Sequence, residues 1–137
     1  MKVKKTILVT WDFTKISENA FLHALKMAKT VDHNIRLLHV VKEDSDISKA
    51  EEKIKTDVNR LTGEHNIPVE YVLLKGKIFS QISQYTANHT DIAMVCMGTH
   101  GMKGSQKYFG SYALKVIVGS PSLYAGQVDA VIGAFRN

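Results

Sequence analysis

Glycines gather in one short stretch of the C-terminal third of the chain. Gly98, Gly101 and Gly104 are closely spaced, and Gly110 is followed by Ser111. Glycine lets backbone N–H groups approach a phosphate closely, and the N-terminus of a helix attracts the same anion. Ser111 stands where a short helix is expected to begin, so the stretch is a candidate phosphate site. The alternative is a flexible connection in which Ser111 only caps the helix.

Asp12 is the second candidate, because it directly follows a run of apolar and β-branched residues, 6–11. Such a run is typical of a buried strand, so Asp12 stands where that strand ends. Its carboxylate either belongs to a ligand site or caps the helix that follows. Trp11, the only tryptophan, either stacks on a ligand base or belongs to the core.

Other kinds of site find less support in the sequence. The glycine stretch is neither a Walker A loop nor a dinucleotide fingerprint, which disfavours P-loop NTPases and dehydrogenases. The histidines are dispersed without metal-ligand spacing, so no metal site is expected. Cys96 stands in an apolar run without an identified base, which predicts inert packing rather than nucleophilic chemistry. His100 is interpreted as an exposed loop residue.

Short β-branched runs alternate with amphipathic segments along the chain. Apolar residues at helical spacing predict helices, with Ser17 as the expected N-cap of the first and with Gly63 and Pro68 bracketing the exit of the second. Residues 127–132 alternate weakly, as a strand would. The predicted strands are 6–11, 35–41, 69–74 and 92–97, and the predicted helices are 17–30, 47–61, 78–89 and 111–118.

Strand–helix units in series predict an α/β fold, with an open, mostly parallel, five-stranded sheet and helices on both faces. Ligands of such sheets bind beyond the carboxyl ends of the strands, where the strand order reverses. Asp12 and the glycine stretch follow two of these strand ends. We therefore expect both candidates to belong to one site.

Composition narrows the class of protein. A chain of 137 residues, 45% hydrophobic and 23% charged, predicts a single globular domain over 1–137. No apolar run approaches the length of a membrane span, and the N-terminus lacks the features of a signal peptide. One cysteine excludes an internal disulfide and favours a reduced, cytoplasmic setting. The net charge of +5 is dispersed without an aromatic-interleaved basic cluster, so nucleic-acid binding is not expected.

Two segments carry a resemblance to a known family. The first strand and its turn read ILVTWDFT from Ile7 to Thr14, and the fourth strand runs into MGTHG from Met97 to Gly101. With these motifs the chain resembles the universal stress protein family over roughly residues 4–120. The resemblance implies a Rossmann-like fold of the adenine nucleotide alpha hydrolase type. Residues 119–137 are atypical, because the usual Pro-Val-hydrophobic strand is missing after Ser120.

The resemblance also implies a set of nucleotide-binding residues. ATP-binding members carry G-2x-G-9x-G-[ST], which Gly98, Gly101 and Gly110-Ser111 match with a spacer of eight residues, 102–109, rather than nine. Asp12 would lie near the adenosine, two residues after Thr10, which belongs to the same site and replaces a proline common in the family. Val40 would line the adenine pocket, which Met97 and Gly98 continue. The ribose and phosphates would be held by Gly101, Gly110, Ser111 and the Tyr112 amide.

The resemblance implies a cytoplasmic, ATP-binding regulatory protein of the stress response that forms a homodimer, with Mg²⁺ modulating the affinity for ATP. Two alternatives stay open. One is a dimeric adaptor that has lost nucleotide binding, which the shortened spacer favours. The other is a slow ATP-hydrolysing enzyme, for which Asp12 and His100 are the available water-orienting groups.

Overall fold

The computed structural model describes residues 4–97 and 123–126. Within them, strands and helices alternate along the chain, with a short 3₁₀ turn at Asp44–Asp46. The strands are β1 (Thr6–Thr10), β2 (Asn34–Val41), β3 (Val69–Lys75), β4 (Ile92–Met97) and β5 (Leu123–Gly126), and the helices are α1 (Lys15–Val31), α2 (Ile47–His65) and α3 (Ile78–Asn88).

The strands pair in the order β3-β2-β1-β4-β5, and every pairing is parallel. The chain first builds outward from β1 to β3 and then returns to add β4 on the other side of β1. The strand order therefore reverses between β1 and β4. This confirms the prediction of an α/β fold with a parallel sheet, and it makes β1 and β4 neighbours, as a shared site requires.

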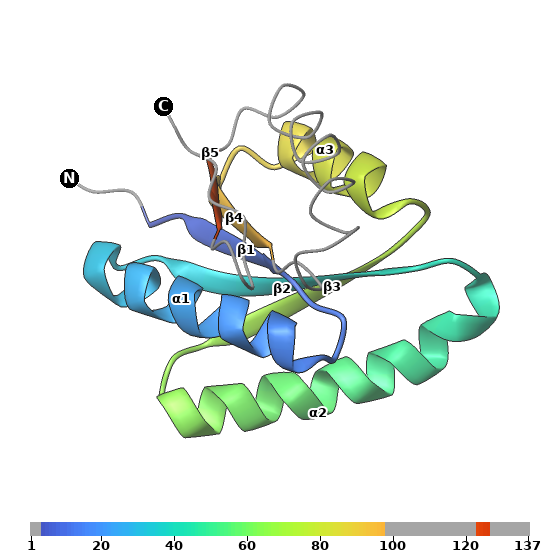
Figure 1. Ribbon diagram of the computed structural model, residues 1–137, viewed down its shortest axis with the longest axis horizontal. Coiled ribbons are helices and arrows are strands. Elements are labelled where there is room, and N and C mark those ends of the chain that lie inside the picture. Colours follow the sequence, from blue (N-terminus) through green and yellow to red (C-terminus); the bar gives the residue numbers. More distant parts are fainter. Residues whose placement is uncertain (1–3, 98–122, 127–137) are drawn as a thin grey trace.

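Helices cover both faces of the sheet: α1 and α2 lie on one face and α3 on the other (Figure 1). Successive side chains of a strand point to opposite faces. Ile7 and Val9 accordingly join a core with α1 and α2, whereas Leu8 joins a separate core with Ile82 of α3. This double burial explains why the strands are continuously apolar in sequence.

Helix α1 begins earlier than expected, with Thr14 rather than Ser17 as its N-cap. The Thr14 side chain accepts a hydrogen bond from the Ser17 N–H, and the Ser17 hydroxyl receives one from the Thr14 N–H, which forms a capping box. Ser17 is thus the third helical residue. The prediction of Ser17 as the N-cap was wrong, because both ends of this reciprocal pair carry hydroxyls.

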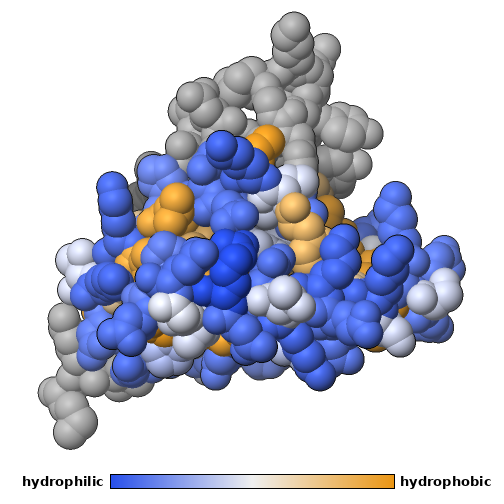
Figure 2. All heavy atoms as spheres, turned by 90° about the horizontal axis from the view of Figure 1, so that it is seen from below, coloured by the Kyte–Doolittle hydropathy of each residue, from blue (hydrophilic) through white to orange (hydrophobic). Residues whose placement is uncertain are grey.

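Helix α2 is longer than expected and includes Gly63, although the sequence predicts that the helix ends before this residue. The helix instead ends at His65 and is followed by Asn66, a left-handed C-cap with φ of 53° whose N–H bonds to the Thr62 carbonyl. The outer surface of the α1–α2 layer is mostly hydrophilic, with scattered apolar side chains (Figure 2). This matches the amphipathic pattern that predicted both helices.

β5 lies at one edge of the described sheet and pairs with β4, with Met94 beside Leu123 and Met97 beside Gly126. This strand comes just before the segment 127–132, whose alternation of residues weakly favours a strand. That segment and the predicted helix 111–118 lie outside the described residues. In the part of the chain that is described, no helix is long and apolar enough to span a membrane.

Candidate functional site

Three of the candidate residues share one face of the sheet near its carboxyl edge. Val40 and Met97 pack with the α3-side core, and Thr10 follows Leu8 on the same side of β1. The register pairs Val9 with Cys96, so Thr10 continues beside Met97, while Thr10 itself pairs with Leu38, two residues before Val40. The fold thus brings Thr10, Val40 and Met97 to the α3 face of adjacent strands.

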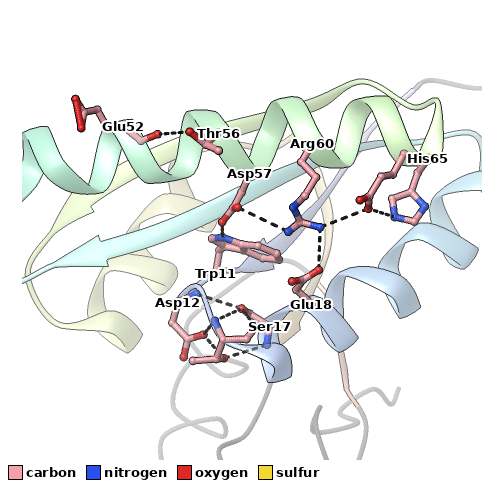
Figure 3. A network of polar contacts seen from close by, with 11 residues as sticks. Trp11, Asp12, Ser17, Glu18, Glu52, Thr56, Asp57, Arg60 and His65 are labelled. Atoms are coloured by element: carbon pink, nitrogen blue, oxygen red, sulfur yellow. Dashed lines mark hydrogen bonds and ion pairs between the residues drawn. The ribbon is translucent and has the colours of Figure 1, made fainter.

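Asp12 lies in the loop between β1 and α1 and is exposed. Its Oδ1 accepts a hydrogen bond from the Thr14 N–H at 3.1 Å and another from the Thr14 hydroxyl, and its own N–H donates to Ser17 Oγ at 3.4 Å. Asp12 therefore holds the N-cap residue of α1 without being the cap itself. The carboxylate lies on the side of the loop away from α2 (Figure 3).

Trp11 points the other way, toward α2 (Figure 3). It is 2% exposed, packs edge-on against Phe21 and donates its indole N–H to Asp57 Oδ2 at 3.0 Å. Of the two roles left open by the sequence, Trp11 thus takes that of a core residue. Its ring belongs to the α1–α2 face, opposite to Thr10, Val40 and Met97.

Phe13 has a backbone conformation that the sequence did not reveal. Its φ is 68°, in the left-handed region that bulky residues rarely adopt. Its ring lies 4.7 Å from the His39 ring, between centroids, and the Lys53 ammonium lies 4.4 Å from the Phe13 ring centroid. Such strain persists where surrounding contacts hold it, often beside functional sites.

A polar network joins α2 to α1 behind this loop (Figure 3). Arg60 pairs with Glu18 of α1 at 3.2 Å, and with Asp57 at 3.7 Å and Glu64 at 3.4 Å on its own helix. Burial disfavours the charged guanidinium, but the hydrogen bond to Glu18 and the surrounding carboxylates outweigh it, so the pKa of Arg60 is raised. No sequence motif marked the pairing of Arg60 with Glu18, because these two residues are 42 positions apart in the chain.

Cys96 is fully buried among the residues of the α1–α2 core. Burial raises the pKa of its thiol to about 12, which keeps it protonated and unreactive at neutral pH. Within residues 4–97 and 123–126, no cluster of histidine, cysteine and acidic side chains could hold a metal ion. The burial of Cys96 and the raised pKa of its thiol agree with the inert packing that the sequence predicts for it.

The remaining candidates, Gly98, Gly101, Gly110, Ser111 and Tyr112, lie outside the described residues, as does His100. The described part of the site combines an exposed carboxylate, a hydroxyl at Thr10 and the apolar side chain of half-buried Val40, with buried Met97 beside them. This set suits binding of a ligand that offers hydrogen-bond donors and a flat apolar ring.

Comparison with solved structures finds the same fold in several proteins. Universal stress protein UspA from Lactobacillus plantarum is 18% identical with a TM-score of 0.71, over 90% of this chain and 97% of the other. A universal stress protein from Archaeoglobus fulgidus in complex with dAMP is 19% identical with a TM-score of 0.66, over 90% and 97%. A universal stress protein in complex with cAMP is 15% identical with a TM-score of 0.68, over 90% and 95%.

A comparison with curated protein sequences finds no match to this chain. The sequence model of one family, however, matches residues 4–122, which is most of the chain and includes both the turn at Asp12 and the glycine stretch. The resemblance noted from the motifs is thereby confirmed. This chain belongs to the universal stress protein family.

Proposed function

We propose that this protein binds an adenine nucleotide, with ATP as its ligand, and acts as a regulatory protein of the stress response in the cytoplasm. The site lies at the carboxyl ends of β1, β2 and β4, on the α3 face of a Rossmann-like sheet of the adenine nucleotide alpha hydrolase type. The observation that carries the proposal is the gathering of Thr10, Val40 and Met97 on that face, at the reversal of strand order, with Asp12 beyond β1.

The sequence that follows Met97 supplies the expected phosphate-binding groups. Gly98, Gly101 and Gly110-Ser111 would offer backbone N–H groups and a hydroxyl to the ribose and phosphates, together with the Tyr112 amide. From residue 98 to residue 122 the chain also carries Lys103, Lys107 and Lys115 and no acidic residue. This local excess of positive charge favours an anionic ligand.

Two of the structural relatives are described as complexes with cAMP and dAMP. Both ligands are adenine nucleotides, which supports this ligand class for the present chain. Mg²⁺ would screen the phosphates and modulate affinity. Binding rather than turnover is the proposed activity, and Asp12 and His100 are the residues to test if slow hydrolysis is found.

Isothermal titration calorimetry of the full chain with ATP tests the proposal. We expect saturable heat from the wild type and none from Gly110→Val, since a side chain there would displace the phosphate. Gly63→Ala is the matched control, because a methyl group at that helical position meets no atom within 4 Å. Absence of binding by the wild type would overturn the proposal and favour the adaptor function, to which the eight-residue spacer also points.

We also propose that the protein is a homodimer that assembles at the β5 edge. β5 pairs with β4 on one side and is the last strand of the described sheet. An edge strand readily pairs with a second chain. Light scattering at micromolar concentration should give about twice the 15.3 kDa of the chain. A mass of one chain at all concentrations would contradict the dimer.

A further inference from the structure

In the sequence, Asp12 lies between two aromatic residues, Trp11 and Phe13, and side chains of helix α2 contact both of them. The Trp11 indole N–H donates to Asp57 Oδ2 at 3.0 Å, and the Lys53 ammonium lies 4.4 Å from the centroid of the Phe13 ring. Lys53 and Asp57 are four residues apart and therefore neighbours on one side of the helix. One turn of α2 thus contacts the residues on both sides of the candidate ligand-binding carboxylate.

Backbone contacts fix the same residues. The Trp11 N–H donates to the Leu38 carbonyl at 2.8 Å, and the Trp11 carbonyl lies 2.6 Å from His39 Nδ1. Since a carbonyl only accepts, His39 carries its proton on Nδ1 and donates here. The His39 ring in turn packs against Phe13 at 4.7 Å between centroids. β2 and α2 therefore hold the loop together.

The left-handed conformation of Phe13 depends on these contacts. At φ of 68°, a bulky residue relaxes toward negative φ unless its side chain is held in place. That relaxation would turn the adjoining peptide and move the Asp12 carboxylate. The contacts of α2 with Phe13 and Trp11 thus act together with the hydrogen bonds from Thr14 to fix where Asp12 points.

We propose that Lys53 and Asp57 are positioning residues of the nucleotide site, acting from the opposite face of the sheet through Phe13 and Trp11 on Asp12. The inference rests on the proposed function, since Asp12 is taken as a ligand contact. Neither side chain needs to touch the nucleotide. Asp57 acts as the acceptor for a buried indole N–H, and Lys53 acts as the cation over the ring.

The test compares Asp57→Ala with Asp57→Asn in the full chain. Alanine leaves the buried indole N–H without its acceptor, whereas asparagine keeps an oxygen there and loses the charge that pairs with Arg60. We expect the affinity for ATP, measured by calorimetry, to fall about tenfold in Asp57→Ala, a typical coupling between linked sites, and to recover in Asp57→Asn. Ile54→Val, a core change on the same helix that keeps both Lys53 and Asp57, should lower thermal stability without lowering affinity.

A second readout needs no nucleotide. In Asp57→Ala, the Trp11 emission and the backbone amide resonance of Asp12 should shift, and in Ile54→Val the Asp12 resonance should not. Equal ATP affinity of Asp57→Ala and the wild type overturns the inference, as does an equal loss in Ile54→Val. If the wild type binds no ATP, the proposed function fails by itself. An unshifted Asp12 resonance in Asp57→Ala would then overturn the positioning role, and a shifted one would support it.

Discussion

The two faces of the sheet end differently at its carboxyl edge. On the α1–α2 face, two side chains cover the strand ends. Trp11 is 2% exposed and donates a hydrogen bond to Asp57 of α2, and His39 packs against the Phe13 ring. On the α3 face, the same strand ends present Thr10 and Val40, both only half-buried, beside Met97. At this edge, the α1–α2 face is thus buried in the core, whereas the α3 face has partly exposed groups of the kind that bind a ligand.

This difference separates residues that are adjacent in sequence. Trp11 and Asp12 follow one another, yet the indole packs toward α2 while the carboxylate lies on the other side of the loop. Cys96 and Met97 likewise belong to opposite cores. Substitutions on the α1–α2 face should therefore change stability first, and substitutions on the α3 face at this edge should change ligand affinity first.

The largest effect is expected for Phe21→Ala, because Phe21 is fully buried in the α1–α2 core. Such a truncation leaves a cavity and costs about 3–5 kcal/mol of unfolding free energy. Val40→Ala on the α3 face, at a half-buried position, should cost about 1 kcal/mol at most and mainly weaken ATP binding. Urea unfolding with calorimetry of both variants measures the contrast, and equal stability losses would remove it.

Gly76→Ala comes next and tests the loop between β3 and α3. Gly76 has φ of 139°, which L-residues rarely adopt, and an added Cβ would lie 2.9 Å from Gln81 Nε2. We expect a loss of about 1–3 kcal/mol, since the backbone conformation is the larger obstacle. Thermal unfolding would show it. The double variant Gly76→Ala with Gln81→Ala separates the two causes. If it regains full stability, the clash with Gln81 is the cause and the backbone conformation is not.

Cys96 makes stability depend on alkaline pH. Its pKa is about 12 in the folded protein and 9.0 when unburied, so the unfolded chain loses the thiol proton first as pH rises. The contribution of this thiol to the free energy of unfolding is complete below pH 9. Above pH 9 it declines by about 1.4 kcal/mol per pH unit until the folded thiol also ionises. Cys96→Ala should show a shallower decline above pH 9 in urea titrations. Parallel pH profiles for the two proteins would contradict the burial of this thiol.

The smallest effect is expected for Gly63→Ala on the outer side of α2. Gly63 is helical and exposed, and an added Cβ meets no atom within 4 Å. Alanine favours the helix by about 1 kcal/mol over glycine. The melting temperature should rise while the ATP affinity stays constant. A fall in the melting temperature would show that α2 has another neighbour at this point.

The sheet was predictable because its strands are buried on both faces and read as apolar runs between amphipathic helices. The same alternation located Asp12 at a strand end, and the glycine stretch directly follows the end of β4. The sequence pattern wrongly predicts Ser17 instead of Thr14 as the N-cap of α1, because the two hydroxyls each satisfy the backbone of the other and both suit a cap. It also misplaced the end of α2, since Gly63 tolerates a helical interior and Asn66 supplies the left-handed cap.

The contacts of α2 with Trp11 and Phe13, the neighbours of Asp12, could not be predicted from local sequence patterns. Trp11 and Asp57 are 46 residues apart, and only the packing of α2 on the sheet brings them together. The positive φ of Phe13 is equally hidden, because such conformations are usually marked by glycine or asparagine. The sequence allows Trp11 either to stack on a base or to belong to the core, and its contacts with Phe21 and Asp57 decide for the core.

The most direct test of the central claim is a titration of ¹⁵N-labelled protein with ATP, followed by amide resonances. The account predicts saturable shifts centred on Thr10, Asp12, Val40 and Met97, with smaller shifts in the α1–α2 core around Phe21. Shifts confined to the α1–α2 layer, or none up to millimolar ATP, would contradict a nucleotide site on the α3 face.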